Sequence, residues 1–244
     1  MIKENRYIGN TKEDEARRIY LESLDLKPSV EDIPVQDSLG RITAQAVEAL
    51  LSSPSFNCAA MDGIAVVTKA TLLARPQEPV FLEEGKDFVY VNTGNPVDEP
   101  YDAVIMKEDV MVEANGLLIH QPAITWQHIR PIGEDIVATE MILPRGHKIR
   151  PFDLGSVIAG GVSQVTVFKK PIVTIIPTGS ELVETPEEIR KGHIPDSNSW
   201  MMAALVEEAG GIAKRYPPCD DDFEIIKKAI AKAAQESDLV LVGA

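Results

Sequence analysis

Hydrophobic and polar positions along the chain follow two different patterns. From about residue 28 to 168, short apolar segments alternate with turn residues such as Asn95-Pro96 and Asn115-Gly116, which predicts strands joined by turns. After Lys169-Lys170, apolar strands alternate with helical periodicity, which is typical of an open parallel α/β sheet. We therefore place the main domain boundary near Phe168 and predict a multidomain protein that combines α+β and α/β parts.

Helical periodicity and end signals predict helices at 11–24, 152–159, 197–209 and 222–235. Thr11 and Asp14 have the spacing of a capping box for the first helix, and Asp221 or Asp222 caps the last. Strands are expected at 35–37, 42–47, 64–67, 88–92, 103–107 and 117–121. Two further strands, 172–176 and 239–242, are wholly apolar, as expected for strands buried on both faces of a parallel sheet.

The net charge of the chain argues against some classes of binding partner. The chain has 24 Lys and Arg against 38 Asp and Glu, a net charge of −14, which argues against binding nucleic acid or anionic lipid through basic residues. A small anionic ligand is still compatible, because backbone N–H groups and helix N-termini bind phosphates without net positive charge. No apolar run is long enough to span a bilayer, and residues 1–10 lack the apolar core of a secretion signal.

The cysteines and histidines do not indicate a disulfide framework or a zinc site. Cys58 and Cys219 are the two cysteines, and the four histidines are scattered without the short spacing of a zinc site. We expect a cytoplasmic protein with reduced thiols. The sequence reaches Gly243-Ala244 directly after an apolar strand, where an α/β sheet places its ligand loops, so we expect a fragment of a longer protein.

Polar motifs in the second half of the chain have both a functional and a purely structural interpretation. Thr178-Gly179-Ser180-Glu181 follows a buried strand, where its N–H groups can bind an anion and Glu181 a cation, or where it can form an ordinary turn. Asp196-Ser197-Asn198 begins a helix, which presents donors to a phosphate or is simply capped. Asp220-Asp221-Asp222 either caps a helix and complements its dipole or, with more carboxylates than one cap needs, serves Mg²⁺ or oxyanion chemistry.

Three motifs in the first half are weak signals when taken singly, because Asp-Gly and Asn-Pro are common turn pairs. They are Ala60-Met61-Asp62-Gly63, Thr93-Gly94-Asn95-Pro96 and Gly133-Glu134-Asp135-Ile136. In combination with the later motifs they form an ordered set. This succession resembles the molybdopterin molybdenumtransferase family, which includes MoeA of bacteria and archaea and the E domain of gephyrin, over nearly the whole chain.

The resemblance implies an activity and an architecture. Members of the family insert molybdenum, supplied as molybdate, into adenylylated molybdopterin and release AMP with help from Mg²⁺; the adenylate comes from a molybdopterin adenylyltransferase. By that similarity, 1–46 holds the N-terminal helix and the first part of a connecting domain, and 47–140 is a β-rich lid. Residues 141–168 complete the connecting domain, and 169–244 form a truncated molybdopterin-binding α/β domain. Family members are usually L-shaped homodimers whose active site combines one subunit's α/β domain with the other's lid.

Site residues are implied by the same resemblance. The catalytic set is Asp62, Thr93, Asp135, Glu181 and Asp221, with Glu181 and Asp221 as magnesium ligands. The residues expected to bind molybdopterin are Thr178, Gly179, Ser180, Asp196, Ser197, Asn198 and Gly243.

Some positions depart from the family's pattern. Ser180 stands where many members carry an acidic or amide residue, Cys58-Ala59 replaces an Asn-Ser pair, and Ile64 replaces an aromatic residue. An alternative interpretation is therefore a carrier or sensor that keeps the fold and binds molybdopterin or a nucleotide without turnover. A scaffold that organises partners, as gephyrin-like proteins do, is a third. The intact acidic set favours catalysis, because a binding protein does not need so many carboxylates.

Overall fold

The computed structural model describes residues 11–24 and 27–243, and the chain divides into two compact units. One unit is Glu31–Val167, and the other joins Met1–Val30 to Phe168–Ala244. The expectations for residues 1–10 and for Ala244 lie outside the described residues.

A three-stranded parallel sheet is the centre of the C-terminal unit. Strand β13 (Ile172–Pro177) lies between β16 (Ile212–Arg215) and β17 (Leu239–Gly243), and all three run in the same direction. The predicted buried strand at 172–176 is confirmed, since every residue from Val173 to Pro177 is buried. The strand at 239–242 is also confirmed, but its expected burial on both faces is wrong, because Val242 is 46% exposed. Among the described residues, β17 pairs with β13 along one of its edges.

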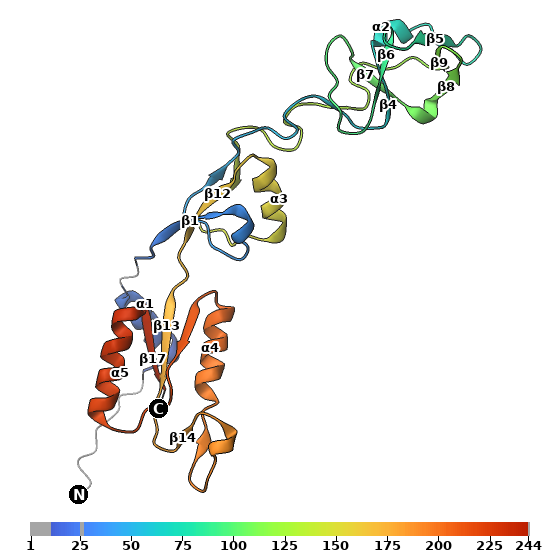
Figure 1. Ribbon diagram of the computed structural model, residues 1–244. Coiled ribbons are helices and arrows are strands. Elements are labelled where there is room, and N and C mark those ends of the chain that lie inside the picture. Colours follow the sequence, from blue (N-terminus) through green and yellow to red (C-terminus); the bar gives the residue numbers. More distant parts are fainter. Residues whose placement is uncertain (1–10, 25–26, 244) are drawn as a thin grey trace, which may run out of the picture. The chain divides into compact units, whose positions relative to one another are not determined.

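Helices cover both faces of this sheet. Helix α4 (Asn198–Glu208) connects β13 to β16, and α5 (Phe223–Glu236) connects β16 to β17 on the other side of β13, so right-handed crossovers place the helices on opposite faces (Figure 1). Strand β16 was not predicted, because Lys214 and Arg215 interrupt its apolar pattern. The predicted cap of α5 is confirmed: the Asp222 carboxylate accepts hydrogen bonds from the amides of Glu224 and Ile225.

Two smaller elements complete this unit. Helix α1 (Glu13–Ser23) confirms the first predicted helix, but its capping box is wrong, because Lys12 occupies the N-cap position and makes no side-chain cap bond. Between β13 and α4 lies a segment that we call the flap, residues 182–195. It begins with β14 (Leu182–Val183), contains the 3-10 helix η3 (Pro186–Glu188) and ends with β15 (Ile194–Pro195), which pairs in parallel with β14.

The other unit contains two three-stranded antiparallel sheets. In the first, β4 (Gly63–Val66) lies between β6 (Phe88–Val91) and β7 (Ala103–Met106). In the second, β9 (Gly116–Ile119) lies between β5 (Val80–Glu83) and β8 (Val110–Glu113). The strands near 64–67, 88–92, 103–107 and 117–121 are confirmed, whereas β5 and β8 were not predicted.

Alternating side chains of β4 fill two cores. Ile64 and Val66 pack with Phe88, Leu82 and Leu117, whereas Ala65 points to the opposite face and packs with a second group of apolar residues. Gly63 has no room for a side chain, because a Cβ would lie 1.9 Å from the carbonyl oxygen of Ile105. The sharp Asp62-Gly63 entry into β4 therefore requires glycine. The short helix α2 (Thr68–Thr71) follows β4.

The remainder of this unit has its own core, made of Val35, Val47, Leu143, Ile149, Val157, Val165 and Val167. Its strands are β1 (Val30–Pro34) with β12 (Gln164–Phe168) and β2 (Val47–Glu48) with β11 (Met141–Leu143). A further pair, β3 (Cys58–Ala59) with β10 (Ile129–Arg130), packs with Ala65 of β4. Helix α3 (Pro151–Ala159) confirms the prediction, and the 3-10 helix η2 (Lys107–Asp109) follows β7.

Two strand predictions in this region are wrong. Residues 35–37 form the 3-10 helix η1 (Val35–Asp37), because the amide and hydroxyl of Ser38 both donate to the carbonyl of Val35 and close a turn. Of residues 42–47, Val47 belongs to a strand, while Ile42 and Thr43 make isolated bridges.

Candidate functional site

The carboxyl ends of β13 and β17 meet at Thr178. Its amide and hydroxyl both donate to the carbonyl oxygen of Gly243, at 2.7 and 2.9 Å, and its side chain is buried. The chain leaves β13 toward β16 and then crosses back to β17, so this contact lies at the point where the strand order reverses. Open α/β sheets bind their ligands in the crevice at that point.

A second loop closes on the same turn. The amide of Gly179 donates to the carbonyl of Cys219 at 3.0 Å, and the Cys219 amide donates to Pro177 at 2.9 Å. The hydroxyl of Ser180 accepts from the amide of Asp221 at 3.2 Å, and the Ser180 amide lies 3.5 Å from the Asp221 carboxylate. Tertiary structure thus brings the motif at 178–181 beside the acidic motif at 220–222.

Glu181 lies on the other side of the turn. Gly179 has φ +148°, and a Cβ there would lie 2.8 and 2.9 Å from the two carboxylate oxygens of Glu181. The carboxylates of Glu181 and Asp221 therefore both lie beside the Gly179-Ser180 turn, and both residues are exposed. Within the described ranges, no three His, Cys, Asp or Glu side chains are grouped closely enough to hold a metal. Mg²⁺ usually takes one or two carboxylates together with substrate phosphates, so either carboxylate beside this turn can supply such a ligand.

The Asp196 carboxylate makes its hydrogen bonds within the protein. It is buried and accepts from the amide of Ser199 at 3.1 Å, from the Ser199 hydroxyl, and from Arg215 at 3.1 Å. Its contacts are those of a helix cap and an ion pair, and a role in binding stays a prediction. Ser197 and Asn198 begin α4 and are exposed. Arg215 was missed by the sequence reasoning, although a basic residue in an apolar strand segment is a signal of a buried ion pair.

A second group of predicted residues lies in the other unit, at the entry to β4. Asp62 accepts hydrogen bonds from the amide and the hydroxyl of Thr93, at 2.8 and 3.0 Å, and its other oxygen lies 3.5 Å from the ammonium of Lys107. A cavity of about 290 Å³ opens beside them. It is lined by Asp62, Gly63, Ile64, Tyr90, Val91, Asn92, Lys107 and Val110.

Electrostatics keep Asp62 ionised. The two hydrogen bonds from Thr93 lower the pKa of Asp62 below its ordinary value; burial opposes this shift, and the positive charge of Lys107 adds a smaller lowering. At neutral pH this carboxylate is an acceptor and not a proton donor. Lys107 was missed by the sequence reasoning, because nothing in the order of residues shows that it faces Asp62.

Asp135 makes different contacts. Both of its oxygens accept from one nitrogen of Arg130, at 2.7 and 2.6 Å, and Glu134 pairs with the Nε of the same guanidinium at 2.9 Å. These carboxylates, Asp135 foremost, raise the pKa of Arg130. The structure therefore brings Asp62 and Thr93 into direct contact, whereas Asp135 is held by a separate cation.

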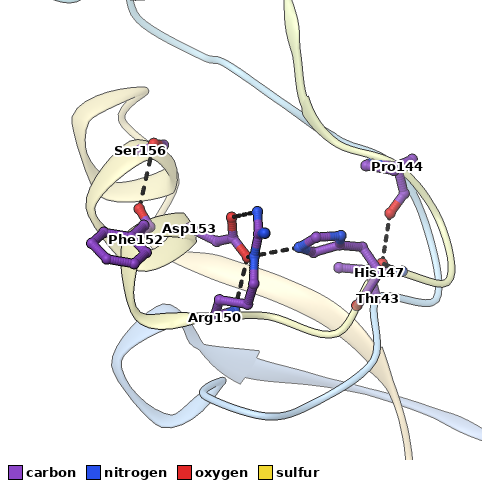
Figure 2. Close-up of polar contacts among 7 residues, drawn as sticks. All are labelled: Thr43, Pro144, His147, Arg150, Phe152, Asp153 and Ser156. Atoms are coloured by element: carbon purple, nitrogen blue, oxygen red, sulfur yellow. Dashed lines mark hydrogen bonds and ion pairs between the residues drawn. The ribbon is translucent and has the colours of Figure 1, made fainter.

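A further ionic cluster braces the start of α3 and was not predicted. Figure 2 shows Arg150 and His147 converging on Asp153, whose Oδ2 lies 2.7 Å from the Nε2 of His147 and accepts from the Arg150 amide at 2.8 Å. The Arg150 guanidinium, followed by His147, holds the pKa of the buried Asp153 well below its usual range. Thr43 joins the same loop through its hydroxyl, which donates to Pro144 at 2.7 Å.

Comparison with known proteins covers both halves of the chain. Residues 11–161 match the family model described as the MoeA N-terminal region (domain I and II). Residues 174–243 match the model described as a probable molybdopterin binding domain. No helix among the described residues is long and apolar enough to cross a membrane.

Individual relatives agree with the family models. A putative molybdopterin biosynthesis protein of Methanocaldococcus jannaschii is 32% identical over 91% of this chain and 59% of its own length. Molybdopterin molybdenumtransferase 2 of Mycobacterium tuberculosis is 31% identical over 86% of this chain and 55% of its own. The crystal structure of the molybdopterin biosynthesis MoeA protein of Pyrococcus horikoshii superposes with a TM-score of 0.84 at 33% identity, covering 94% of this chain and 65% of that one. The chain thus spans somewhat more than half the length of these curated relatives.

Proposed function

This chain belongs to the MoeA family, and from that premise we propose that the whole protein is a molybdopterin molybdenumtransferase. It inserts molybdenum, supplied as molybdate, into adenylylated molybdopterin and releases AMP. One observation carries the proposal: the carboxylates of Glu181 and Asp221 flank a glycine turn at the carboxyl end of a parallel sheet, where its strand order reverses. Relatives named molybdopterin molybdenumtransferase support it over most of the chain's length.

The turn supplies the groups that the reaction needs at the phosphate. The Ser180 hydroxyl, which accepts a hydrogen bond from the Asp221 amide, can donate its own proton to an anion. Glu181 and Asp221 are the residues that would hold Mg²⁺, which when bound offsets the charge that develops on the leaving phosphate. Without a cation, two neighbouring carboxylates would repel both molybdate and a phosphate, so we expect turnover to require the divalent ion.

Asp62 and Thr93 have a separate role in the proposal. Thr93 orients the Asp62 carboxylate through two hydrogen bonds and keeps it ionised, so that it can accept a hydrogen bond from a reactant. Asp135 contributes through its ion pair with Arg130. We further propose that the protein acts in the cytoplasm as a homodimer that receives its substrate from a molybdopterin adenylyltransferase.

Complementation tests the proposed activity. The full-length protein should restore a molybdenum-dependent reductase in cells that lack molybdenumtransferase, and Asp62→Ala, Glu181→Ala or Asp221→Ala should abolish the rescue. Glu187→Ala is the matched control, since it removes an exposed carboxylate from the flap and should rescue normally. Normal rescue by the alanine variants would reject these residue roles. If the wild-type protein binds molybdopterin and yet fails to rescue, the carrier or sensor function replaces the enzyme.

A further inference from the structure

Arg215 joins both ends of the flap to the central sheet. It is the last residue of β16, and its side chain is only 13% exposed. One guanidinium nitrogen donates to Glu184 at 2.6 Å, directly after β14, and the other donates to Asp196 at 3.1 Å, directly after β15. Glu184 lies near the start of the flap and Asp196 directly follows its last residue, so a single side chain holds both of its ends.

Neighbouring groups hold the guanidinium in place. Its second nitrogen also donates to the hydroxyl of Ser199 at 3.2 Å, and the ring of Trp200 lies 4.2 Å from its central carbon. Asp196 and Ser199 are buried, so the ion pair is shielded from solvent on that side. The planar fork of arginine reaches two carboxylates at once, which a lysine ammonium does not do in the same geometry.

The flap needs this support, because its own pairing is short. Strands β14 and β15 share two residue pairs, and the amides of Ile194 and Asp196 donate across them to Glu181 and Val183, each at 2.9 Å. Isolated two-stranded pairs are marginal in water. The Ile194 bond ends on the carbonyl of Glu181, so the position of the flap decides where the Glu181 backbone lies.

We propose that Arg215 is a positioning residue that fixes the flap to β16 and thereby holds the Glu181 carboxylate beside Gly179. The structural part of this inference concerns the flap alone, and its effect on turnover rests on the proposed function. The Arg215 hydrogen bonds described above go to Glu184, Asp196 and Ser199, and none of them is made to the Gly179-Ser180 turn. Arg215 acts through Glu184, Asp196 and the β14–β15 pair.

Amide hydrogen exchange on this 244-residue chain tests the structural part. In Arg215→Met, the Ile194 and Asp196 amides should exchange at least about tenfold faster, because two charged hydrogen bonds that hold the flap are lost. The Ile212 amide, which donates to Pro171 in the sheet, should keep its rate. Arg190→Met is the matched control: it removes the same charge from the flap, where Arg190 donates to the carbonyls of Glu187 and Ile189. It should leave the Ile194 and Asp196 amides unchanged.

A second variant covers the case in which Arg215→Met does not fold. Glu184→Gln keeps the Arg215–Asp196 pair and loosens one end of the flap, so the Ile194 amide should exchange faster than in the wild type and more slowly than in Arg215→Met. The proposal is overturned if the Ile194 amide is unaffected in the variants that fold. It is also overturned if the Ile212 amide speeds up equally, because Arg215 then stabilises the whole unit and does not position the flap.

Kinetics of the full-length protein test the link to Glu181. Arg215→Met should raise the Mg²⁺ concentration for half-maximal turnover by about fivefold or more, since a misplaced carboxylate binds the ion less well, and Arg190→Met should not. An unchanged Mg²⁺ requirement, together with faster flap exchange, would overturn the positioning of Glu181. A wild-type protein without turnover would instead reject the proposed function, and the exchange experiment would still decide the role of Arg215 in the flap.

Discussion

Thr178 donates two hydrogen bonds to the carbonyl oxygen of Gly243, one from its amide at 2.7 Å and one from its hydroxyl at 2.9 Å. Thr178 directly follows β13 and Gly243 ends β17, and these strands are neighbours in the parallel sheet. The contact therefore fixes the turn of Gly179 and Ser180 against β17. The Thr178 side chain is buried by this contact. Its effect on a ligand is therefore exerted through the position of the turn.

Replacing Thr178 with valine removes the hydroxyl bond and keeps the shape of the side chain. The Gly243 carbonyl still accepts from the amide, so we expect a loss of about 1 kcal/mol in the free energy of unfolding. Urea denaturation measures it. Thr11→Val, at an exposed position before α1, should change stability by much less. Equal stability of Thr178→Val and the wild type would show that the hydroxyl bond adds nothing.

Alanine variants at Gly179 and Gly192 distinguish the effect of backbone strain from the effect of displacing the Glu181 side chain. Both glycines have positive φ, +148° and +96°, but a Cβ meets the Glu181 carboxylate at Gly179 and open space at Gly192. Alanine at either site should cost about 1–3 kcal/mol of stability. Only Gly179→Ala should also lower turnover of the full-length protein, by about tenfold or more. Steady-state kinetics on both variants check this, and equal turnover would mean that the Glu181 position is not critical.

Asp62 offers a direct electrostatic measurement. Thr93→Val removes the hydroxyl bond to the carboxylate and should raise the pKa of Asp62 more than Lys107→Met does, because that bond lowers the pKa more than either the charge or the hydrogen bond of Lys107. A carbon-detected NMR titration of the Asp62 carboxyl gives both values. The reverse order of the two variants, or an ordinary pKa for Asp62 in the wild type, would contradict this account.

The cluster around Asp153 makes stability depend on pH. Its pKa is lowered on folding, chiefly by Arg150, so its contribution to stability is complete above the unfolded value of about 3.9 and is lost as the pH falls below it. Asp153→Asn should reduce the free energy of unfolding at pH 7 by roughly 2 kcal/mol or more and should flatten its decline below pH 4.

Denaturant titrations between pH 3 and 7 test the effect. Asp98→Asn, at an exposed position, is the control and should retain both the stability and the decline in acid. A decline of unchanged steepness in Asp153→Asn would assign the acid sensitivity to other carboxylates.

Local patterns predicted the elements whose signals are carried by adjacent residues. The apolar run of β13, strands β4, β6, β7 and β9 of the antiparallel sheets, the Asp222 cap and helix α3 after Arg150-Pro151 were all recognisable. Failures came where one side-chain contact decides the conformation, whether its partner is distant or local. Strand β16 contains Lys214 and Arg215, whose charges are accommodated because Arg215 pairs with Asp196, and residues 35–37 turn because Ser38 bonds back to Val35.

The residues of the candidate site also divide into those that the sequence predicts and those that it does not. The motif residues Asp62, Thr93, Glu181 and Asp221 could be named from their order in the chain and its resemblance to a family. The cations that pair with the predicted carboxylates could not be assigned in this way, because the order of residues does not show that Lys107 faces Asp62 or that Arg215 faces Asp196.

By itself, the sequence determined that this protein has a β-rich part followed by a parallel α/β part, and which acidic motifs are candidates for chemistry. These properties depend on periodicity and on turn residues, which are short-range. Only the tertiary structure decided that Ser180 meets Asp221, that Thr178 meets Gly243, and that Asp196 is used by Arg215 and Ser199. Those contacts depend on strand order and on crossover connections, which bring together residues far apart in the chain and which no local pattern encodes.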